Sequence, residues 1–182
     1  GGEFMKYAVK SDKGLVRDNN EDSFSILGGS KEIPLTFIIA DGMGGHNSGE
    51  LASKMAVEYV GNYIRSFPDK FRNEESIFSA IQGVMKDANT NVYNTSLVNK
   101  ANYGMGTTFT IAIIHNQKLF IGHVGDSRVY IIRDGSINRL TTDHSFIEEL
   151  IRNGSLTREE ASSHPNRNII TRALGCSEEM QV

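Results

Sequence analysis

The order of the predicted elements is the feature that most limits the fold of this chain. Strands come first, two neighbouring helices follow, and further strands complete the core. The predicted strands cover 7–10, 22–27, 34–40, 107–114, 119–124, 129–133 and 137–140, and the two long helices cover about 47–67 and 74–93. Strands and helices do not alternate regularly, which argues against a doubly wound parallel sheet. The order favours antiparallel sheets with helices packed outside them.

The strand at 34–40 is nearly all apolar and β-branched, which is typical of a strand that is buried on both faces. We expect it to stop at the glycine-rich run Asp41-Gly42-Met43-Gly44-Gly45. A helix then begins near Asn47, because Asn47 and Glu50 have the spacing of a capping box. Pro68 ends this helix.

The size and charge of the chain limit its class. Its 182 residues suit one domain, expected to cover 5–182, and the four residues before Met5 are typical of a cloning remnant. With 19 basic and 22 acidic side chains the net charge is -3, which gives no support for binding nucleic acid or an anionic membrane. One cysteine, Cys176, cannot form an internal disulfide, so we expect a cytoplasmic protein.

Three aspartates lie at the ends of predicted strands. Asp22 opens one strand, Asp41 follows the most apolar strand, and Asp126 follows the strand at 119–124. Carboxylates held close together repel one another unless cations lie between them. Ligation by oxygen alone favours Mg²⁺ or Mn²⁺ over Zn²⁺.

Each of these features alone has a simpler interpretation. Asp126 beside a glycine is typical of a turn, and Asp22 is typical of the start of a strand. The run from Gly42 to Gly45 suits either a tight turn or a phosphate cradle. It is not a P-loop, because no Gly-Lys-Ser/Thr follows it, and the βαβ unit of a dinucleotide site is missing. The joint occurrence of these features in one chain favours function.

Five motifs, in their order along the chain, resemble those of bacterial type 2C (PPM) protein Ser/Thr phosphatases, and the resemblance runs from about Lys6 to Gly175. They are Arg17-Asp18-Asn19-Asn20-Glu21-Asp22, Asp41-Gly42-Met43-Gly44-Gly45-His46, Gly104-Met105-Gly106-Thr107-Thr108, Val124-Gly125-Asp126-Ser127-Arg128 and Leu140-Thr141-Thr142-Asp143-His144-Ser145. The resemblance implies an α+β fold, with an antiparallel β-sandwich flanked by pairs of helices. It also implies a flap over the site, at about 145–172.

The resemblance further implies a cluster of two Mn²⁺ or Mg²⁺ ions, or of three. Asp41 would bridge two ions, the carbonyl oxygen of Gly42 would bind one of them, and Asp22 would bind the second. Glu21 would support a water on the metal. Asp126 would orient water or hold a third ion.

The implied reaction is hydrolysis of phosphoserine and phosphothreonine on proteins by a water that the metal activates. Arg17 would hold the phosphate with a bidentate fork, which lysine cannot supply. Met43 stands where many eukaryotic members have a histidine that is the proposed general acid. His46 has two open interpretations: contact with substrate or leaving group, or a structural place at the start of a helix. The implied partners are phosphorylated proteins and a Ser/Thr kinase that the enzyme opposes.

The family's last two metal-binding aspartates, in a Ser-Asp-Gly and an Asp-Asn motif, have no counterpart before Val182. We therefore expect a fragment with weak or no activity, loose metal binding, and exposed strand edges that favour a dimer or aggregate. Three alternatives stay open: a non-catalytic regulatory module with this fold, a phosphatase acting on an anti-sigma antagonist, and an unrelated Mg²⁺-dependent phosphohydrolase.

Overall fold

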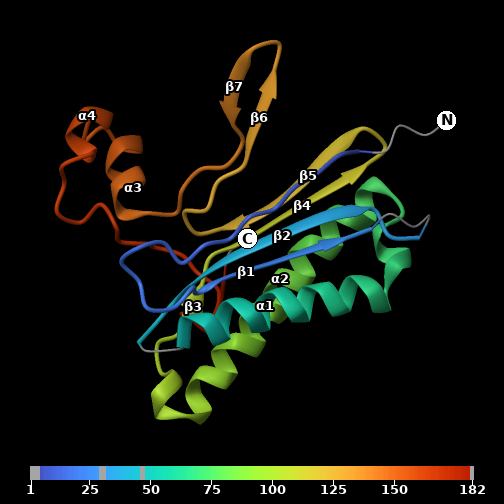
Figure 1. Cartoon of the computed structure of the whole chain (residues 1–182), viewed down its shortest axis with the longest axis horizontal. Helices are drawn as coiled ribbons and strands as arrows, with labels where there is room; N and C mark the ends of the chain where they lie inside the picture. The colour runs from blue at the N-terminus through green and yellow to red at the C-terminus, as the bar shows by residue number, and fades with distance from the viewer. Residues whose placement is uncertain (1–4, 29–31, 46–47, 181–182) are drawn as a thin grey trace.

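The computed structural model describes residues 5–28, 32–45 and 48–180. Its centre is a five-stranded antiparallel sheet in the order β1-β2-β4-β5, with β3 pairing to β2 (Figure 1). These strands are β1 (Asp22–Leu27), β2 (Leu35–Met43), β3 (Gly106–Thr107), β4 (Phe109–His115) and β5 (Lys118–Val124). A separate hairpin of β6 (Tyr130–Arg133) and β7 (Ser136–Arg139) projects from one end of the sheet.

Two long helices cover one face of the sheet. They are α1 (Ser48–Ser66) and α2 (Glu74–Val98), which lie side by side in Figure 1, with the short 3₁₀ helices η1 (Pro68–Phe71) and η2 (Lys100–Asn102) after each. Both helices contribute fully buried side chains to the core, as the zero exposure of Val60 and Val84 shows. Gly122 of β5 permits this close approach, because a Cβ atom there would lie 2.4 Å from Ile81 Cγ2. Burial of this apolar layer is the main source of stability in such an arrangement.

Several predicted elements are confirmed and others are wrong. The strand at 22–27 is confirmed with the predicted limits. The second strand runs on through the glycine-rich run to Met43, because Gly42 and Met43 pair with β3. Helix α2 continues to Val98, so the end predicted for this helix, at 93, is wrong. The proposed cap at Asn47 lies outside the described residues.

The strand predicted at 7–10 is absent, because these residues have no strand partner among the described residues. The segment instead rests on the face of the sheet opposite the helices. The rings of Tyr7 and Phe37 meet edge to face there, with 5.7 Å between their centroids. An edge-to-face contact of this kind holds the segment without backbone pairing.

The sheet face opposite the helices is only partly covered. Phe24 and Ile39 are paired across β1 and β2, and they remain 45% and 41% exposed. The described residues therefore form an α+β arrangement of antiparallel strands with one layer of helices. The β-sandwich with pairs of helices on both sides is not formed by these residues alone, and stays a prediction for a longer chain.

The segment after β7 carries α3 (Phe146–Arg152) and α4 (Arg158–Ala161), beyond the end of the sheet from which the hairpin projects. The chain then returns to the sheet, where Thr107 and Leu174 exchange two backbone hydrogen bonds of 3.0 and 2.9 Å. This return anchors the far end of the predicted flap to β3.

Asn89 of α2 provides a second anchor for the returning chain and yields a testable prediction. Its side chain is 1% exposed; it accepts from the Gly175 N–H at 2.8 Å and donates to the carbonyls of Ser177 and Glu178 at 3.0 and 3.1 Å. We expect Asn89→Ala to lower the free energy of unfolding by about 2–3 kcal/mol, because buried polar groups lose their partners. Urea denaturation measures this. The exposed Asn94→Ala on the same helix should change it by less than about 0.5 kcal/mol, and an equal loss in both variants would contradict the assignment.

Candidate metal and phosphate site

The pairing of β1 with β2 places two of the predicted metal-binding residues opposite each other. Asp22, the first residue of β1, is the cross-strand partner of Asp41, near the end of β2. Opposite residues of an antiparallel pair point to the same face of the sheet. Two carboxylates in that position repel each other, so the register itself creates a place that favours a cation.

The strand register brings Asp126 to the same end of the sheet. Ile39 of β2 pairs with Thr110 of β4, and Phe109 of β4 pairs with Val124 of β5. The end of β2 and the end of β5 therefore lie in one row, and Asp126 follows β5 by two residues. Antiparallel pairing decides this position, because it turns strand ends that are far apart in sequence toward one edge.

Glu21 lies behind this row and is held by its backbone. Its carbonyl oxygen accepts from the Gly42 N–H at 3.0 Å and from Ser53 Oγ of α1 at 2.6 Å. Its side-chain Oε1 is buried and has no hydrogen-bond partner among the described residues. Gly49 makes the room, because a Cβ atom there would lie 2.6 Å from this oxygen. A buried carboxylate oxygen without a partner is costly unless a donor or cation satisfies it.

The electrostatics of Asp41 show that the predicted acids act on one another. Its pKa rises from 3.8 to about 6, first because burial removes water from the carboxylate, and then because Asp22, Asp126 and Glu21 repel its negative charge. The positive charge of Arg17 acts in the opposite direction. The structure therefore brings five of the seven predicted site residues into electrostatic range of one another. Gly42 follows Asp41 in the same strand, and His46 lies outside the described residues.

The backbone of Asp41 is fixed by the Gly-Thr-Thr motif that follows η2. Its carbonyl accepts from the Thr108 N–H at 2.9 Å and from Thr107 Oγ1 at 3.0 Å, and its N–H donates to Thr108 Oγ1 at 2.9 Å. Thr108 Oγ1 also shares a hydrogen bond of 2.8 Å with Ser127 Oγ. One hydroxyl thus joins Asp41 to the neighbour of Asp126. The sequence contained this motif but carried no sign of the role, since the contact joins residues 67 positions apart.

Glycine is required where the Asp126 loop begins. Gly125 has a φ of +106°, which side chains rarely adopt, and a Cβ atom there would lie 2.6 Å from Thr108 Cγ2. The loop therefore packs directly on Thr108. Asp126 can lie in a turn, as its glycine neighbour indicates, and still be part of the site.

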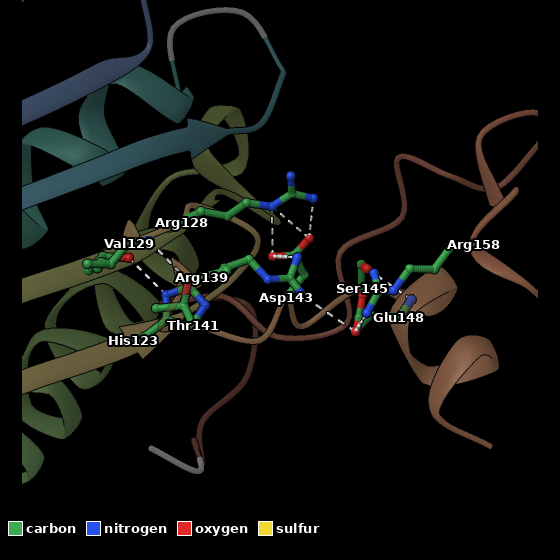
Figure 2. A network of polar contacts seen from close by, with 10 residues as sticks. His123, Arg128, Val129, Arg139, Thr141, Asp143, Ser145, Glu148 and Arg158 are labelled. Carbon is green, nitrogen blue, oxygen red and sulfur yellow. Dashed lines mark hydrogen bonds and ion pairs between the residues drawn. The ribbon is translucent and has the colours of Figure 1, made fainter. Parts of the chain in front are cut away.

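A network of ion pairs joins the Asp126 loop to the predicted flap (Figure 2). Arg128 contacts the Asp143 carboxylate through both Nε and Nη2, at 2.6 to 3.1 Å. Arg139 reaches Asp143 and Glu148 at 3.5 Å, and Arg158 of α4 reaches Glu148 at 3.3 Å. Asp143 and Glu148 are each 7% exposed, so their charges depend on these arginines.

The donor set suits a hard divalent cation without forming a finished site. Asp22, Asp41, Asp126 and Glu21 offer carboxylate oxygens only, which Mg²⁺ and Mn²⁺ prefer. The raised pKa of Asp41 and the unpartnered oxygen of Glu21 are both features that a cation would relieve. In the part of the chain that is described, however, no three His, Cys, Asp or Glu side chains are arranged to hold a metal ion as they stand.

Comparison with known proteins agrees with the geometry. Residues 16–177 match the family model described as protein phosphatase 2C. The chain belongs to the protein phosphatase 2C family. Among curated protein phosphatase 2C relatives, the serine/threonine phosphatase stp of Listeria monocytogenes is 35% identical over 178 residues, which are 98% of this chain and 70% of that protein.

Solved structures of protein phosphatase 2C relatives share the fold. The serine/threonine phosphatase Stp1 from Staphylococcus aureus is 34% identical with a TM-score of 0.85, over 93% of this chain and 66% of that one. The catalytic domain of the phosphatase PstP, solved with 2 manganese ions, is 32% identical with a TM-score of 0.73, over 91% of this chain and 65% of that one. This chain thus spans about two thirds of the solved chains. Within the described residues no helix combines the length and hydrophobicity needed to cross a membrane.

The charge on Asp41 gives a prediction about stability and pH. The pKa of Asp41 is about 6 in the folded chain, against the ordinary value of 3.8 expected when the chain is unfolded. The folded state therefore binds the proton more tightly, and the stability that this proton contributes is complete below about pH 4 and is lost as the pH rises through 6. A shift of two units would be worth about 2.7 kcal/mol. Asp41 is only partly removed from water, and the solvent that still reaches its carboxylate reduces this to about 1 kcal/mol. In EDTA, Asp41→Asn should therefore be more stable than the unsubstituted chain at pH 7.5, and the difference should vanish near pH 4. Urea denaturation at both pH values measures it. Asp87→Asn on the exposed side of α2 is the control, and a less stable Asp41→Asn at pH 7.5 would contradict the crowding of charge.

The Thr108 hydroxyl gives a second prediction. Thr108→Val keeps the shape of the side chain but removes the acceptor for the Asp41 N–H and the link to Ser127. Thr108 is fully buried, so we expect a loss of about 1–3 kcal/mol in the free energy of unfolding. Thermal or urea denaturation checks it against Thr142→Val, an exposed residue whose substitution should be nearly neutral. A neutral Thr108→Val would show that the hydroxyl does not support Asp41.

Proposed function

We propose that this chain carries the larger part of a metal-dependent protein serine/threonine phosphatase centre. The observation that carries this proposal is the convergence of Asp22, Asp126 and Glu21 on Asp41 at one end of the sheet. Burial of Asp41 and then repulsion from these three acids raise its pKa to about 6. Acidic residues that perturb one another in this way are typical of functional sites. Membership of the protein phosphatase 2C family supports the same reading.

Asp41 would bridge two Mn²⁺ or Mg²⁺ ions, with the Gly42 carbonyl on one and Asp22 on the other. Asp126 would hold a third ion or orient water, and Glu21 would accept a hydrogen bond from water in the cluster. When bound, such ions supply a nucleophilic water near neutral pH and neutralise charge on phosphoryl oxygens. The presence of 2 manganese ions in the PstP catalytic domain supports this assignment.

Arg17 would bind the substrate phosphate. Its charge already acts on Asp41, and its exposed guanidinium can donate two parallel hydrogen bonds to two phosphoryl oxygens. A phosphate held in this way would lie beside the carboxylate row, which is the placement that in-line attack on phosphorus requires. His46 would contact the substrate or its leaving group. No residue is required to form a covalent phosphoenzyme.

Substrate choice would depend on the flap at about 145–172, and the substrates would be proteins phosphorylated by a Ser/Thr kinase. By itself this chain would bind metal loosely and have weak or no activity, since its described acids form no closed set of ligands. The partly exposed sheet face at Phe24 and Ile39 and the outer strands β1 and β5 would favour a dimer or aggregate. A cytoplasmic location stays a prediction.

The same absence of a closed ligand set favours a second candidate, a non-catalytic regulatory module that keeps the phosphatase fold. This module would bind partners through the flap and would not hydrolyse phosphate. It differs from the first candidate in one measurable respect, which is turnover in the presence of Mn²⁺.

The deciding experiment measures phosphate released from a phosphothreonine peptide with Mn²⁺, for this chain and for the product of the complete open reading frame. We expect activity in the latter that EDTA removes. Asp41→Asn should lower kcat/KM at least about 100-fold, because even outer partners of metal ligands cost 10- to 100-fold. Asp87→Asn is the matched control and should retain activity. Folded protein without Mn²⁺-dependent turnover in either form would overturn the phosphatase and favour the regulatory module.

A further inference from the structure

Two adjacent residues hold both ends of the loop that carries Asp126. Asp143 binds Arg128 at the far end of the loop through a bidentate ion pair (Figure 2). His144 binds Gly125 at the near end in both directions. Its backbone N–H donates to the Gly125 carbonyl at 2.8 Å, and its ring Nδ1 accepts from the Gly125 N–H at 3.1 Å.

His144 also closes the base of the predicted flap. Its carbonyl accepts from the Thr171 N–H at 2.8 Å. The next residues continue this contact, with Ser145 bridging to Ile170 and the Phe146 N–H donating to the Ile169 carbonyl at 3.0 Å. We call residues 144–146 and 169–171 the flap neck. The neck closes the segment that carries α3 and α4, and one residue joins it to the Asp126 loop.

The ring of His144 is held in the orientation that this contact needs. It stacks on His123 with 5.2 Å between ring centroids, and His123 Nδ1 in turn shares a 2.9 Å hydrogen bond with Thr110 Oγ1 of β4. Burial, together with the nearby His123 and Arg172, lowers the pKa of His144. The ring is therefore neutral near pH 7, and Nδ1 is free to accept from a backbone N–H.

We propose that His144 is a positioning residue that couples the flap neck to the Asp126 loop. The position of Asp126 then depends on a closed neck, and a closed neck depends on an ordered loop. The coupling must act in both directions, because linkage between two sites is reciprocal. The importance of this coupling for catalysis rests on the proposed function. The coupling itself rests only on the contacts described above.

Hydrogen exchange of single backbone amides, measured by NMR on this chain without metal, tests the coupling. His144→Ala removes the acceptor for the Gly125 N–H but leaves the 144 carbonyl in place. We expect faster exchange at Gly125 and also at Thr171, each by about 10-fold or more, which corresponds to about 1.4 kcal/mol of lost protection. His144→Asn should restore both, because its Oδ1 can accept from the Gly125 N–H as Nδ1 does.

A second variant tests the opposite direction. Thr171→Pro removes the one N–H that closes the neck on the His144 carbonyl, and does not touch Gly125. We expect it to accelerate exchange at Gly125. His115→Ala, at the other end of β4, is the control and should alter neither amide. Unchanged Gly125 exchange when the neck opens, or a His144→Ala effect confined to Gly125, would overturn the coupling.

Mn²⁺ affinity provides a readout for the site itself. Calorimetry should show that His144→Ala weakens Mn²⁺ binding by about 10-fold, with His144→Asn near the unsubstituted chain, as for other residues that orient a ligand from outside. Equal Mn²⁺ affinity in all three would show that the loop contact does not act on the metal site. Hydrogen exchange is measured without metal, so its result tests the coupling independently of Mn²⁺ binding. If no variant of this chain binds Mn²⁺, the proposed function fails but the test of the coupling still stands.

Discussion

The site depends on one unfavourable interaction that the fold has to sustain. Asp22 and Asp41 face each other across β1 and β2, and burial and neighbouring charges raise the pKa of Asp41. Side chains alone would move apart to relieve this repulsion. They stay together because the backbones that carry them are strands of one sheet, whose other face is closed by α1 and α2. The apolar burial beneath the sheet therefore sustains the crowding of charge at its end.

A second group of residues converts strand ends into a defined site. Thr108 binds the backbone of Asp41 and reaches Ser127, while Asp143 and His144 hold the two ends of the Asp126 loop. None of these residues offers a ligand in the proposed cluster. Their hydrogen bonds limit how far the acidic residues can move, which is the usual means by which a protein tunes a metal site from outside its ligands.

The same arrangement brings the predicted flap close to the chemistry. Buried Asp143 and Glu148 are each paired with arginines, so α3 and α4 are tied to β7 and the Asp126 loop by charges that cannot easily separate. The flap is thus joined to the site by backbone contacts at its neck and by ion pairs along one side.

Local patterns in the sequence were sufficient for the strand at 22–27, the two long helices and the order of elements, because alternation and helical periodicity are properties of neighbouring residues. They were insufficient for 7–10, which has the composition of a strand but no partner in the described sheet. They were also insufficient for Gly42 and Met43, whose partners Thr107 and Gly106 in β3 are distant in the chain.

The sequence by itself determined which residues are acidic, where they stand relative to the strands, and which family motifs they form. Only the tertiary structure decided that Asp22 lies opposite Asp41, that Glu21 has a buried oxygen without a partner in the described residues, and that His144 joins the flap neck to Gly125. The reason is that register, burial and hydrogen bonding across the fold depend on residues distant in the chain. No pattern within one segment contains that information.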